Sequence, residues 1–181
     1  MAPGDHDKRR YDPLTIILHW VTALLTLVLW AGAKSLDLVP AGALRADARS
    51  LHIVLGIALG ALGGGRFVWR LSFGRPLPET GAGLMGLASK AAHAGLYALL
   101  AVMVGVGMLL AWTGGDSFFG QFAAPSPDAN DRDLARGLQQ LHGLIGWLIV
   151  ALVGVHSGAA LVHQYVLRDG LLNRMWPGRR A

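Results

Sequence analysis

Seven histidines are the residues of this chain best equipped for chemistry, because the 181-residue sequence contains no cysteine. Imidazole binds transition metals, donates and accepts hydrogen bonds, and titrates near neutral pH. The absence of cysteine excludes disulfides, thiolate-ligated metal sites and thiol catalysis. The histidines are His6, His19, His52, His93, His142, His156 and His163. Their spacing therefore decides which imidazole chemistry the chain supports.

Two of these histidines have a spacing that suits two separate sites on one helix. His142 and His156 are fourteen residues apart, which is close to four helical turns and about 21 Å of rise. On a helix they point from nearly the same face. One helix would thus present one imidazole to each of two levels.

The elements that must position the histidines are four long apolar stretches. The chain is 53% hydrophobic and 15% charged, against roughly 45–50% and 25% in soluble domains. The stretches cover approximately residues 14–33, 50–67, 87–112 and 138–167, with Arg66 and Lys90 near segment ends as their charged residues. Each approaches the roughly 20 residues that cross a bilayer, and none has the polar stripe of a soluble bundle. The sequence predicts an all-α bundle of four transmembrane helices, with residues 1–181 as a single membrane domain.

A cleaved signal peptide is the competing interpretation of the first stretch. Lys8, Arg9 and Arg10 precede this stretch, and residues 31–33 resemble a cleavage site. Its apolar run exceeds the usual length of about 7–15 residues and carries His19 near its start. We therefore expect a helix that remains in the chain.

The distribution of positive charge predicts that both termini are cytoplasmic. Of the 16 lysines and arginines, eleven fall in the N-terminal segment, the second loop and the C-terminal tail, and five fall in the other two loops. Lysine and arginine are retained on the cytoplasmic side of membranes. The loop 113–135, with Pro125 and Pro127, would be the largest external feature. The net charge of +5 is thus mainly a topology signal, and nucleic-acid binding is the weaker alternative.

Depth along the helices sorts the histidines into two layers. His52 and His142 lie near the outer surface, and His19, His93 and His156 lie near the cytoplasmic side. Two stacked haems need this arrangement, because each iron takes two axial imidazoles from facing helices. We expect His52 with His142 at an outer haem and His19 with His156 at an inner haem, with His93 as the rival inner ligand. The lack of cysteine excludes covalently attached c-type haem. Interhelical hydrogen bonding is the alternative for any single histidine.

Small residues beside four of the histidines leave room for a porphyrin. One turn after His19, His52, His142 and His156 stand Ala23, Gly56, Gly146 and Ala160, whereas Tyr97 follows His93 and Leu167 follows His163. The contrast favours the four expected ligands. Close helix packing is the alternative explanation of small residues, and we expect it for Gly60 and Gly64.

The other polar residues near the cytoplasmic helix ends have less specific signals. Arg66 and Arg70 would neutralise haem propionates, bind lipid headgroups or simply set the orientation. His163 would hydrogen-bond a quinone carbonyl or be solvated, and His6 is expected to be exposed without a role. The tryptophans are interpreted as interfacial or packing residues rather than electron relays.

The histidine motifs resemble those of the bacterial cytochrome b561 family. The resemblance extends from Leu18-His19-Trp20 to the Arg-Met-Trp-Pro tail at 174–177, and its most specific part is the run 141–165 with its paired histidines. It implies two b-type haems, with His19 and His156 as the cytoplasmic-side ligands and His52 and His142 as the outer ones. It also implies a bacterial inner membrane, electron exchange with ubiquinone and, in the closest members, oxidation of superoxide to oxygen at the outer face.

Two redox functions and one transport function follow as hypotheses. The leading one is a membrane oxidoreductase in which superoxide, or another one-electron donor, reduces the outer haem. The electron then moves to the inner haem, which reduces ubiquinone. The alternative is a haem-bearing membrane anchor that passes electrons between a partner dehydrogenase or cytochrome c and quinone. Metal or proton transport is the third, although histidine pairs about 21 Å apart do not form one ion site. A homodimer is compatible with each hypothesis.

The charge of the third loop bears on the choice of electron donor. This loop carries Asp128, Asp131 and Asp133. An acidic loop would repel superoxide unless it stands aside from the outer cations, which are Arg45, Arg49 and Arg136. The positions of those cations therefore matter for the superoxide hypothesis.

Overall fold

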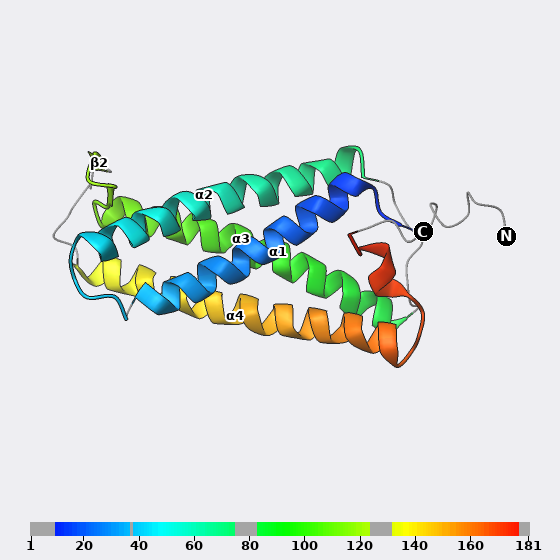
Figure 1. Cartoon of the computed structure of the whole chain (residues 1–181). Helices are drawn as coiled ribbons and strands as arrows, with labels where there is room; N and C mark the ends of the chain where they lie inside the picture. The colour runs from blue at the N-terminus through cyan, green and yellow to red at the C-terminus, as the bar shows by residue number, and fades with distance from the viewer. Residues whose placement is uncertain (1–9, 37, 75–82, 124–131, 178–181) are drawn as a thin grey trace.

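Four long helices run antiparallel, one after another, in the computed structural model of the chain (Figure 1). The structure describes residues 10–36, 38–74, 83–123 and 132–177, so that His6, Pro125 and Pro127 lie outside the described residues. The helices are α1 (Pro13–Leu36), α2 (Ala43–Ser72), α3 (Leu84–Thr113) and α4 (Arg132–Tyr165). Strands β1 (Ser117–Phe118) and β2 (Phe122–Ala123) form a short antiparallel pair, and a 3-10 helix, η2 (Leu171–Arg174), follows α4. The predicted all-α fold is confirmed, with the β pair as an appendage between α3 and α4.

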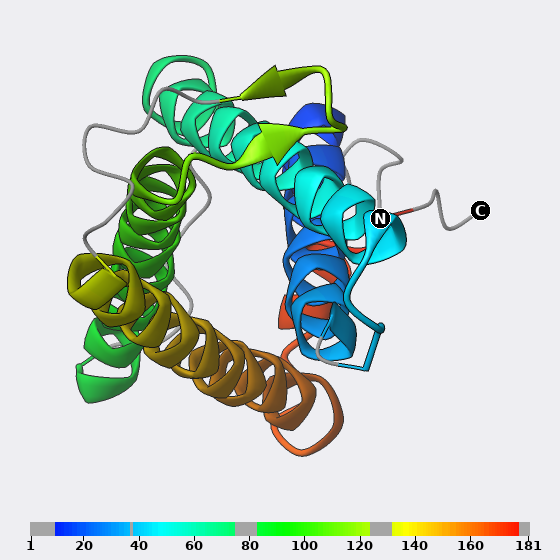
Figure 2. The same ribbon diagram turned by 90° about the vertical axis from the view of Figure 1, so that its left-hand side faces the viewer.

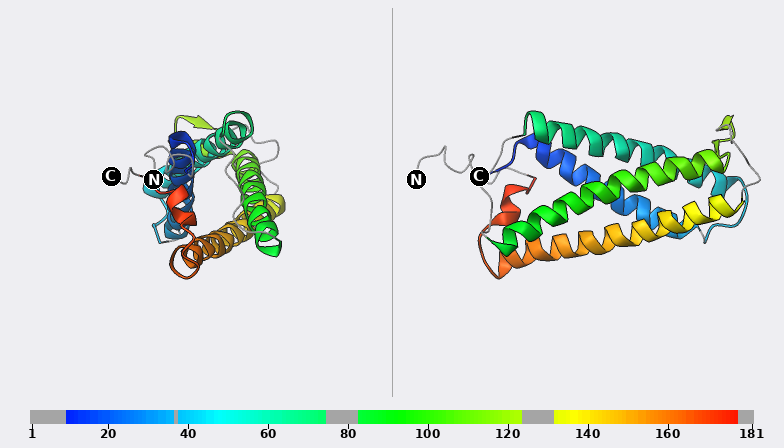
Figure 3. Two further views of the ribbon diagram at one scale, coloured as in Figure 1. Left: turned by 90° about the vertical axis from the view of Figure 1, so that its right-hand side faces the viewer. Right: turned by 180° about the vertical axis from the view of Figure 1, so that it is seen from behind.

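The bundle has two distinct ends. The end at which α1 begins, α2 ends, α3 begins and α4 ends is called the η2 end, because η2 lies beside it (Figure 3). The opposite end is called the hairpin end, because β1 and β2 lie there next to α2 (Figure 2). Along the bundle axis the helices stand at the corners of a square, and α1 packs on α2, α2 on α3, and α3 on α4. This order lets residues far apart in the sequence meet at one level.

The outer surface of the bundle is apolar. Leu24, Leu144 and Val155 are 65%, 57% and 66% exposed, and the four helices contain 24, 30, 30 and 34 residues. At 1.5 Å per residue they are about 36 to 51 Å long, enough to cross a bilayer. Long helices whose large apolar side chains point outward fit a multi-pass membrane protein, as predicted.

The helix boundaries differ from the predicted ranges for local reasons. α2 begins at Ala43 rather than at residue 50. The helix extends beyond the apolar stretch into a segment that contains charged residues, which an apolar-length rule leaves out. α4 ends at Tyr165 rather than at residue 167. Past this end, Arg168 and Gly170 have φ angles of 55° and 72°, which turn the backbone out of the helix. Apolar content does not reveal such a turn, because the residues just before it are as apolar as the helix itself.

Glycines of α2 allow close contact with α3. A Cβ atom at Gly60 would come within 2.8 Å of Val104, and one at Gly63 within 3.1 Å of Leu100. The packing role predicted for Gly60 is therefore confirmed. The same role is wrong for Gly64, since no heavy atom of the described chain lies within 4 Å of its Cβ position. The four-residue spacing along α2 does not keep both glycines on the interface with α3.

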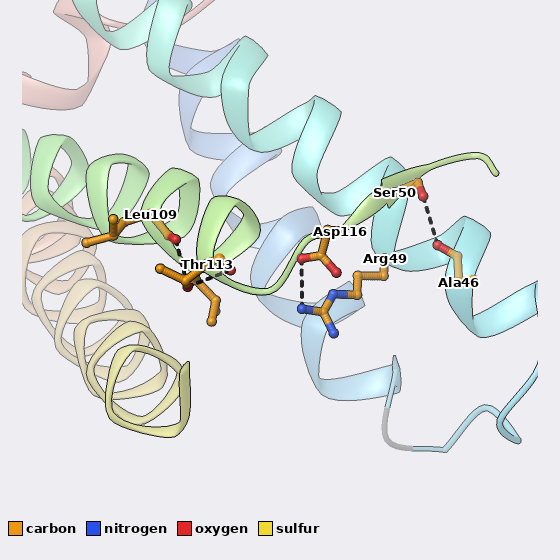
Figure 4. Close-up of polar contacts among 7 residues, drawn as sticks. Ala46, Arg49, Ser50, Leu109, Thr113 and Asp116 are labelled. Carbon is orange, nitrogen blue, oxygen red and sulfur yellow. Dashed lines mark hydrogen bonds and ion pairs between the residues drawn. The ribbon is translucent and has the colours of Figure 1, made fainter. Parts of the chain in front are cut away.

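Ser50 anchors the hairpin to the start of α2 (Figure 4). Its side chain is 1% exposed, and its Oγ donates to the Ala46 carbonyl at 2.9 Å while accepting from the Phe119 N–H at 3.1 Å. Beside it, Arg49 Nη2 and Asp116 Oδ2 form an ion pair at 2.8 Å. These contacts hold the segment after α3 against α2, one turn from His52.

Replacing Ser50 by alanine is expected to destabilise the hairpin end. The substitution removes the acceptor of the Phe119 N–H in a part-buried hydrogen bond, and a typical intramolecular hydrogen bond contributes about 0.5–1.5 kcal/mol to stability. The thermal unfolding midpoint of the detergent-solubilised protein, followed by far-ultraviolet circular dichroism, should fall. Ser35→Ala is the matched control, because the Ser35 hydroxyl bonds only within its own exposed helix turn. Equal midpoints in the two variants would contradict this role of Ser50.

The segment that follows α4, residues 166–177, folds back beside the start of α1, and we call it the C-terminal strap. Trp20 Nε1 donates to the Met175 carbonyl at 2.7 Å, and the Tyr11 N–H donates to the Arg174 carbonyl at 3.2 Å. The Trp20 and Trp176 rings meet edge to face with centroids 6.2 Å apart. Trp20 is thus a packing residue that joins the two ends of the sequence.

A hydrogen bond between His163 and Asp169 fixes the turn between α4 and the strap. His163 Nδ1 lies 2.5 Å from Asp169 Oδ2, and Asp169 Oδ1 accepts the Leu171 N–H at 3.0 Å. The hydrogen bond from His163 lowers the pKa of Asp169 from its ordinary value of 3.8. The ionised carboxylate is therefore the form that the folded turn prefers.

We expect the strap to loosen in acid. Because the pKa of Asp169 is lower in the folded state, its contribution to stability is present above about pH 4 and is lost as the pH falls through the folded value. Amide hydrogen exchange of residues 171–176, corrected for the intrinsic pH dependence of exchange, should accelerate between about pH 5 and pH 2.5. Asp169→Asn should show fast exchange throughout. If amide exchange in Asp169→Asn depended on pH in the same way as in the unmodified protein, Asp169 would not be the group that links the strap to pH.

Candidate functional site

A cavity of about 850 Å³ lies inside the half of the bundle nearest the η2 end. This volume is in the range of about 300–1,000 Å³ that is usual for ligand and cofactor sites. All four helices and the C-terminal strap contribute to its walls, and His19 of α1, His93 of α3 and His156 of α4 line it. The fold thus brings the three predicted inner histidines to one chamber from three different helices.

The ring separations measured from His156 distinguish His19 from His93 as its partner at one metal. Two imidazoles on opposite sides of one metal, with metal–nitrogen bonds of about 2.0 Å, place their ring centres about 6.3 Å apart. The His19 and His156 ring centres are 6.4 Å apart, whereas those of His93 and His156 are 5.1 Å apart. The His19–His156 pair matches the span of a metal, and the His93–His156 pair is too close for it.

The outer pair has the same span. The His52 and His142 ring centres are 6.2 Å apart. The His142 ring lies against Gly107 of α3, where a Cβ atom would come within 3.0 Å of Cε1. Gly107 therefore gives this ring its space, a role that the sequence did not single out, because it depends on contact between α3 and α4.

The donor set suits a cofactor that brings most of its own ligands. Within the described part of the chain, no group of three or more histidine, aspartate or glutamate side chains is arranged to hold a metal ion. Two imidazoles supply only the axial positions of an iron whose other ligands come from a porphyrin. The facing pairs therefore fit haem better than a bare ion, which weighs against the transport hypothesis.

Arg66 is the most closely engaged of the cavity cations. Its Nη2 lies 3.0 Å from His19 Nδ1, and its guanidinium carbon lies 5.4 Å from the centre of the Tyr97 ring. Among the described residues, no carboxylate pairs with Arg66 or with Arg70, which also lines the cavity. Because guanidinium only donates, His19 Nδ1 is the acceptor in this contact. A half-buried cation such as Arg66, without a carboxylate partner among the described residues, is suited to an anionic group of a ligand.

The small residues beside the histidines have different surroundings. Ala23 and Ala160 line the cavity, and no heavy atom of the described chain lies within 4 Å of the Cβ position of Gly56. By contrast, the Cβ position of Gly146 is 3.2 Å from Met103 and 3.7 Å from Trp30. Gly146 therefore serves side-chain packing rather than open space.

Two cavity features were not visible in the sequence. The Tyr97 hydroxyl is buried and has no hydrogen-bond partner among the described residues. The strap contributes Leu171, Leu172 and Met175 to the walls. The position of Tyr97 one turn after His93 gives no sign of an unpaired hydroxyl, and the strap residues lie some 150 positions from the α1 residues that they contact.

His163 lies away from this cavity. Its Nδ1 is paired with Asp169, and its ring is absent from the cavity wall. The predicted quinone contact of His163 is therefore a separate hypothesis from the inner chamber, and it would use the remaining ring nitrogen.

The fold and the site define a class of protein. Membrane-length helices that carry facing imidazole pairs, one pair beside an internal cavity, form a helical membrane protein built to hold a prosthetic group within its bundle.

Residues 10–178 match the family model described as prokaryotic cytochrome b561, and the chain belongs to this family. It is a membrane cytochrome of the electron-transport type, and the family binds haem b.

Curated relatives cover nearly the whole chain. A protein named "Probable superoxide oxidase CybB" from Yersinia pestis is 30% identical over 177 residues, which cover 96% of this chain and 99% of the relative. Cytochrome b561 homolog 1 of Escherichia coli (strain K12) is 29% identical over 178 residues, covering 94% and 99%. Cytochrome b562 of Cereibacter sphaeroides is 32% identical over 180 residues, covering 91% and 94%.

Proposed function

We propose that this chain is a di-haem membrane cytochrome b that moves electrons between the outer face of the bacterial inner membrane and the quinone pool. The observation that carries the proposal is the span of two imidazole pairs, 6.4 Å for His19–His156 and 6.2 Å for His52–His142. A structural hydrogen bond between two imidazoles would need no such span, and the same span recurs at two levels of the bundle.

The chain's residues divide the work between ligation, neutralisation and enclosure. His19 and His156 hold the inner haem, and His52 and His142 hold the outer haem. Arg66 and Arg70 neutralise the propionates of the inner haem, and the strap covers its cavity. Bound haem supplies the one-electron chemistry, while the protein sets its position and local charge.

The orientation follows from the distribution of charge. The η2 end, to which the N-terminal segment, the loop between α2 and α3 and the C-terminal tail belong, carries eleven of the 16 lysines and arginines. This excess supports a cytoplasmic η2 end. The inner haem then faces the cytoplasm, and electrons travel from the hairpin end toward the η2 end to ubiquinone.

Superoxide is the donor that we propose first. The relative from Yersinia pestis, named as a probable superoxide oxidase, matches the chain over nearly its full length. A donor as small as superoxide needs no docking partner. Each superoxide that gives up one electron would become one molecule of oxygen.

A haem-bearing anchor that serves a partner dehydrogenase or cytochrome c is the second candidate. At the hairpin end, Arg49 pairs with Asp116 and Arg136 pairs with Asp133. Two of the three cations expected to attract superoxide are thus engaged by carboxylates, which weakens their long-range attraction for a small anion. This pairing favours a protein electron donor, which would bind through a larger contact surface than superoxide can.

A spectrum and a superoxide assay separate these functions. A reduced-minus-oxidised spectrum of the purified protein, with a pyridine haemochrome assay, should give two b-type haems per chain; a colourless protein would refute the proposal. The haem-loaded protein should then accelerate superoxide decay and reduce added ubiquinone. Unchanged superoxide decay, together with co-purification of a dehydrogenase or c-type cytochrome, would select the anchor function instead.

A further inference from the structure

A corner between α1 and α4, toward the hairpin end, contains polar groups that the proposed haem ligation does not use. The Trp30 and Trp147 rings meet there edge to face, with their centroids 5.1 Å apart. Lys34, one helical turn after Trp30 on α1, has its Nζ 5.2 Å from the centre of the Trp147 ring. Trp147 thus brings Trp30 and Lys34 together, and we call these three residues the α1/α4 corner.

The α1/α4 corner lies at the level of the proposed outer haem. Lys34 is fifteen residues after His19 on α1, and His142 is fourteen residues before His156 on α4. His19 and His156 face each other, and rises of about 21 to 23 Å along the two antiparallel helices lead from them to Lys34 and His142. Lys34 and the outer ligand His142 therefore have nearly the same depth.

The indole N–H of Trp30 lacks an acceptor. Its Nε1 is buried and has no hydrogen-bond partner among the described residues, although a buried tryptophan N–H ordinarily has one. The neighbouring ring atom, Cδ1, is 3.7 Å from the Cβ position of Gly146, which is one turn after His142 on α4. This donor therefore lies beside the helix face that carries the outer ligand.

Lys34 adds a positive charge at the same corner. Its side chain is exposed, and among the described residues it contacts the Trp147 ring rather than a carboxylate. An ammonium group over an aromatic face keeps N–H donors for a further acceptor. A donor and a cation one turn apart on the same helix are together suited to a carboxylate.

We propose that Trp30 and Lys34 hold a propionate carboxylate of the outer haem, an inference that rests on the proposed function. The propionates are the only charged groups on the rim of haem b, so a donor and a cation at this depth select that edge of the porphyrin. The indole N–H bonds the carboxylate inside the bundle, and the ammonium neutralises it toward the exposed surface. The α1/α4 corner thus gives the outer haem what we propose that Arg66 and Arg70 give the inner haem.

The competing location is Arg49, three residues before His52 on α2. Its Nη2 is already paired with Asp116 Oδ2 at 2.8 Å (Figure 4), and the Asp116 side chain is only 14% exposed. A propionate at Arg49 would meet this carboxylate, and two neighbouring carboxylates disfavour each other's charge. The α1/α4 corner is therefore the better site on grounds of charge.

The test uses the full chain loaded with haem in detergent, with Trp30→Phe, Lys34→Gln and Lys34→Arg as variants. Trp112→Phe, at an exposed tryptophan of α3, is the matched control for the indole, and Arg132→Gln, at the exposed start of α4, is the control for the charge. Haem content is measured first. Two readouts follow: the propionate bending band in the resonance Raman spectrum, and the midpoint potential of each haem. The outer haem is the one that His142→Ala loses.

We expect Trp30→Phe and Lys34→Gln to keep both haems and to shift the propionate band of the outer haem. A less neutralised propionate disfavours the added electron, so the ratio of reduced to oxidised outer haem at a fixed potential should fall. The fall should be about threefold in Trp30→Phe and about twofold in Lys34→Gln, whose charge is screened by solvent, equivalent to about 30 and 20 mV. Lys34→Arg should restore both readouts, and the two controls should leave them unchanged.

An unchanged propionate band and outer potential in Trp30→Phe would overturn the site, as would an equal shift in Trp112→Phe or in the inner haem. If Trp30→Phe loses the outer haem, an unchanged band in Lys34→Gln overturns the site and a shifted band supports it, because the exposed Lys34 is not needed for core packing. An unmodified protein with fewer than two haems would instead refute the proposed function.

Discussion

Replacing His156 by alanine is expected to reduce the haem content from two per chain to one. The His156 ring lies at metal-binding span from His19, so its loss would leave the inner iron with one imidazole ligand fewer. Replacing His142 should remove the other haem for the same reason, since its span from His52 is 6.2 Å. Pyridine haemochrome assays on equal amounts of folded protein measure both losses.

The identity of the remaining haem makes this prediction specific. The haems lost from His156→Ala and His142→Ala should differ in midpoint potential, because they occupy different layers with different charge around them. His19→Ala should reproduce the His156 result, while His93→Ala should keep both haems. If His93→Ala loses a haem and His19→Ala does not, the ring separations have led to the wrong inner ligand.

Replacing Arg66 by glutamine is expected to lower the midpoint potential of the inner haem. A nearby positive charge stabilises the reduced, less positive iron, and Arg66 lies 3.0 Å from the ring of a proposed ligand. One unit charge at about 10 Å in an effective dielectric of about 20 is worth roughly 1.7 kcal/mol. A free energy of about 1.4 kcal/mol corresponds to about 59 mV for a one-electron couple. A downward shift of about 50 mV or more should appear in a redox titration.

Matched variants separate charge from hydrogen bonding in this effect. Arg66→Lys keeps the charge and should recover most of the potential. Arg136→Gln removes a cation at the hairpin end and should leave the inner potential within about 10 mV, because screening weakens distant exposed charges. A shift in Arg136→Gln as large as that in Arg66→Gln would show that net charge, rather than the position of Arg66, sets the potential.

The Arg66 result also bears on the order of the two haems in electron transfer. Cations gather at the η2 end, with Arg66, Arg70 and Lys90 all in the cavity wall. At the hairpin end, Arg49 and Arg136 are paired with carboxylates. We expect the inner haem to have the higher potential, which favours electron flow toward the η2 end.

Much of the fold was predictable because apolar length is a local property. A stretch of some 20 residues without charge forms a helix in a bilayer whatever its neighbours are, since every backbone group must be bonded within the segment. The four helices follow from this rule. The turn after Tyr165 did not, because it depends on the left-handed backbone of Arg168 and Gly170 rather than on composition.

The histidine layers were predictable for a similar reason. Rise and angle per residue are fixed in a helix, so the positions of His142 and His156 on α4 follow from their numbers alone. The same arithmetic gives the depth of each histidine on its own helix. Helix geometry alone does not determine which face of one helix packs against which face of another.

The sequence by itself determined four apolar helices, two levels of imidazole and a family resemblance that the whole-length match supports. Only the tertiary structure decided that His19 stands at metal-binding span from His156 while His93 does not, that Arg66 contacts His19, and that the Tyr97 hydroxyl lacks a partner among the described residues. The physical reason is that helix periodicity is set along one chain segment. The rotation and tilt of each helix against the next are set by side-chain packing between segments.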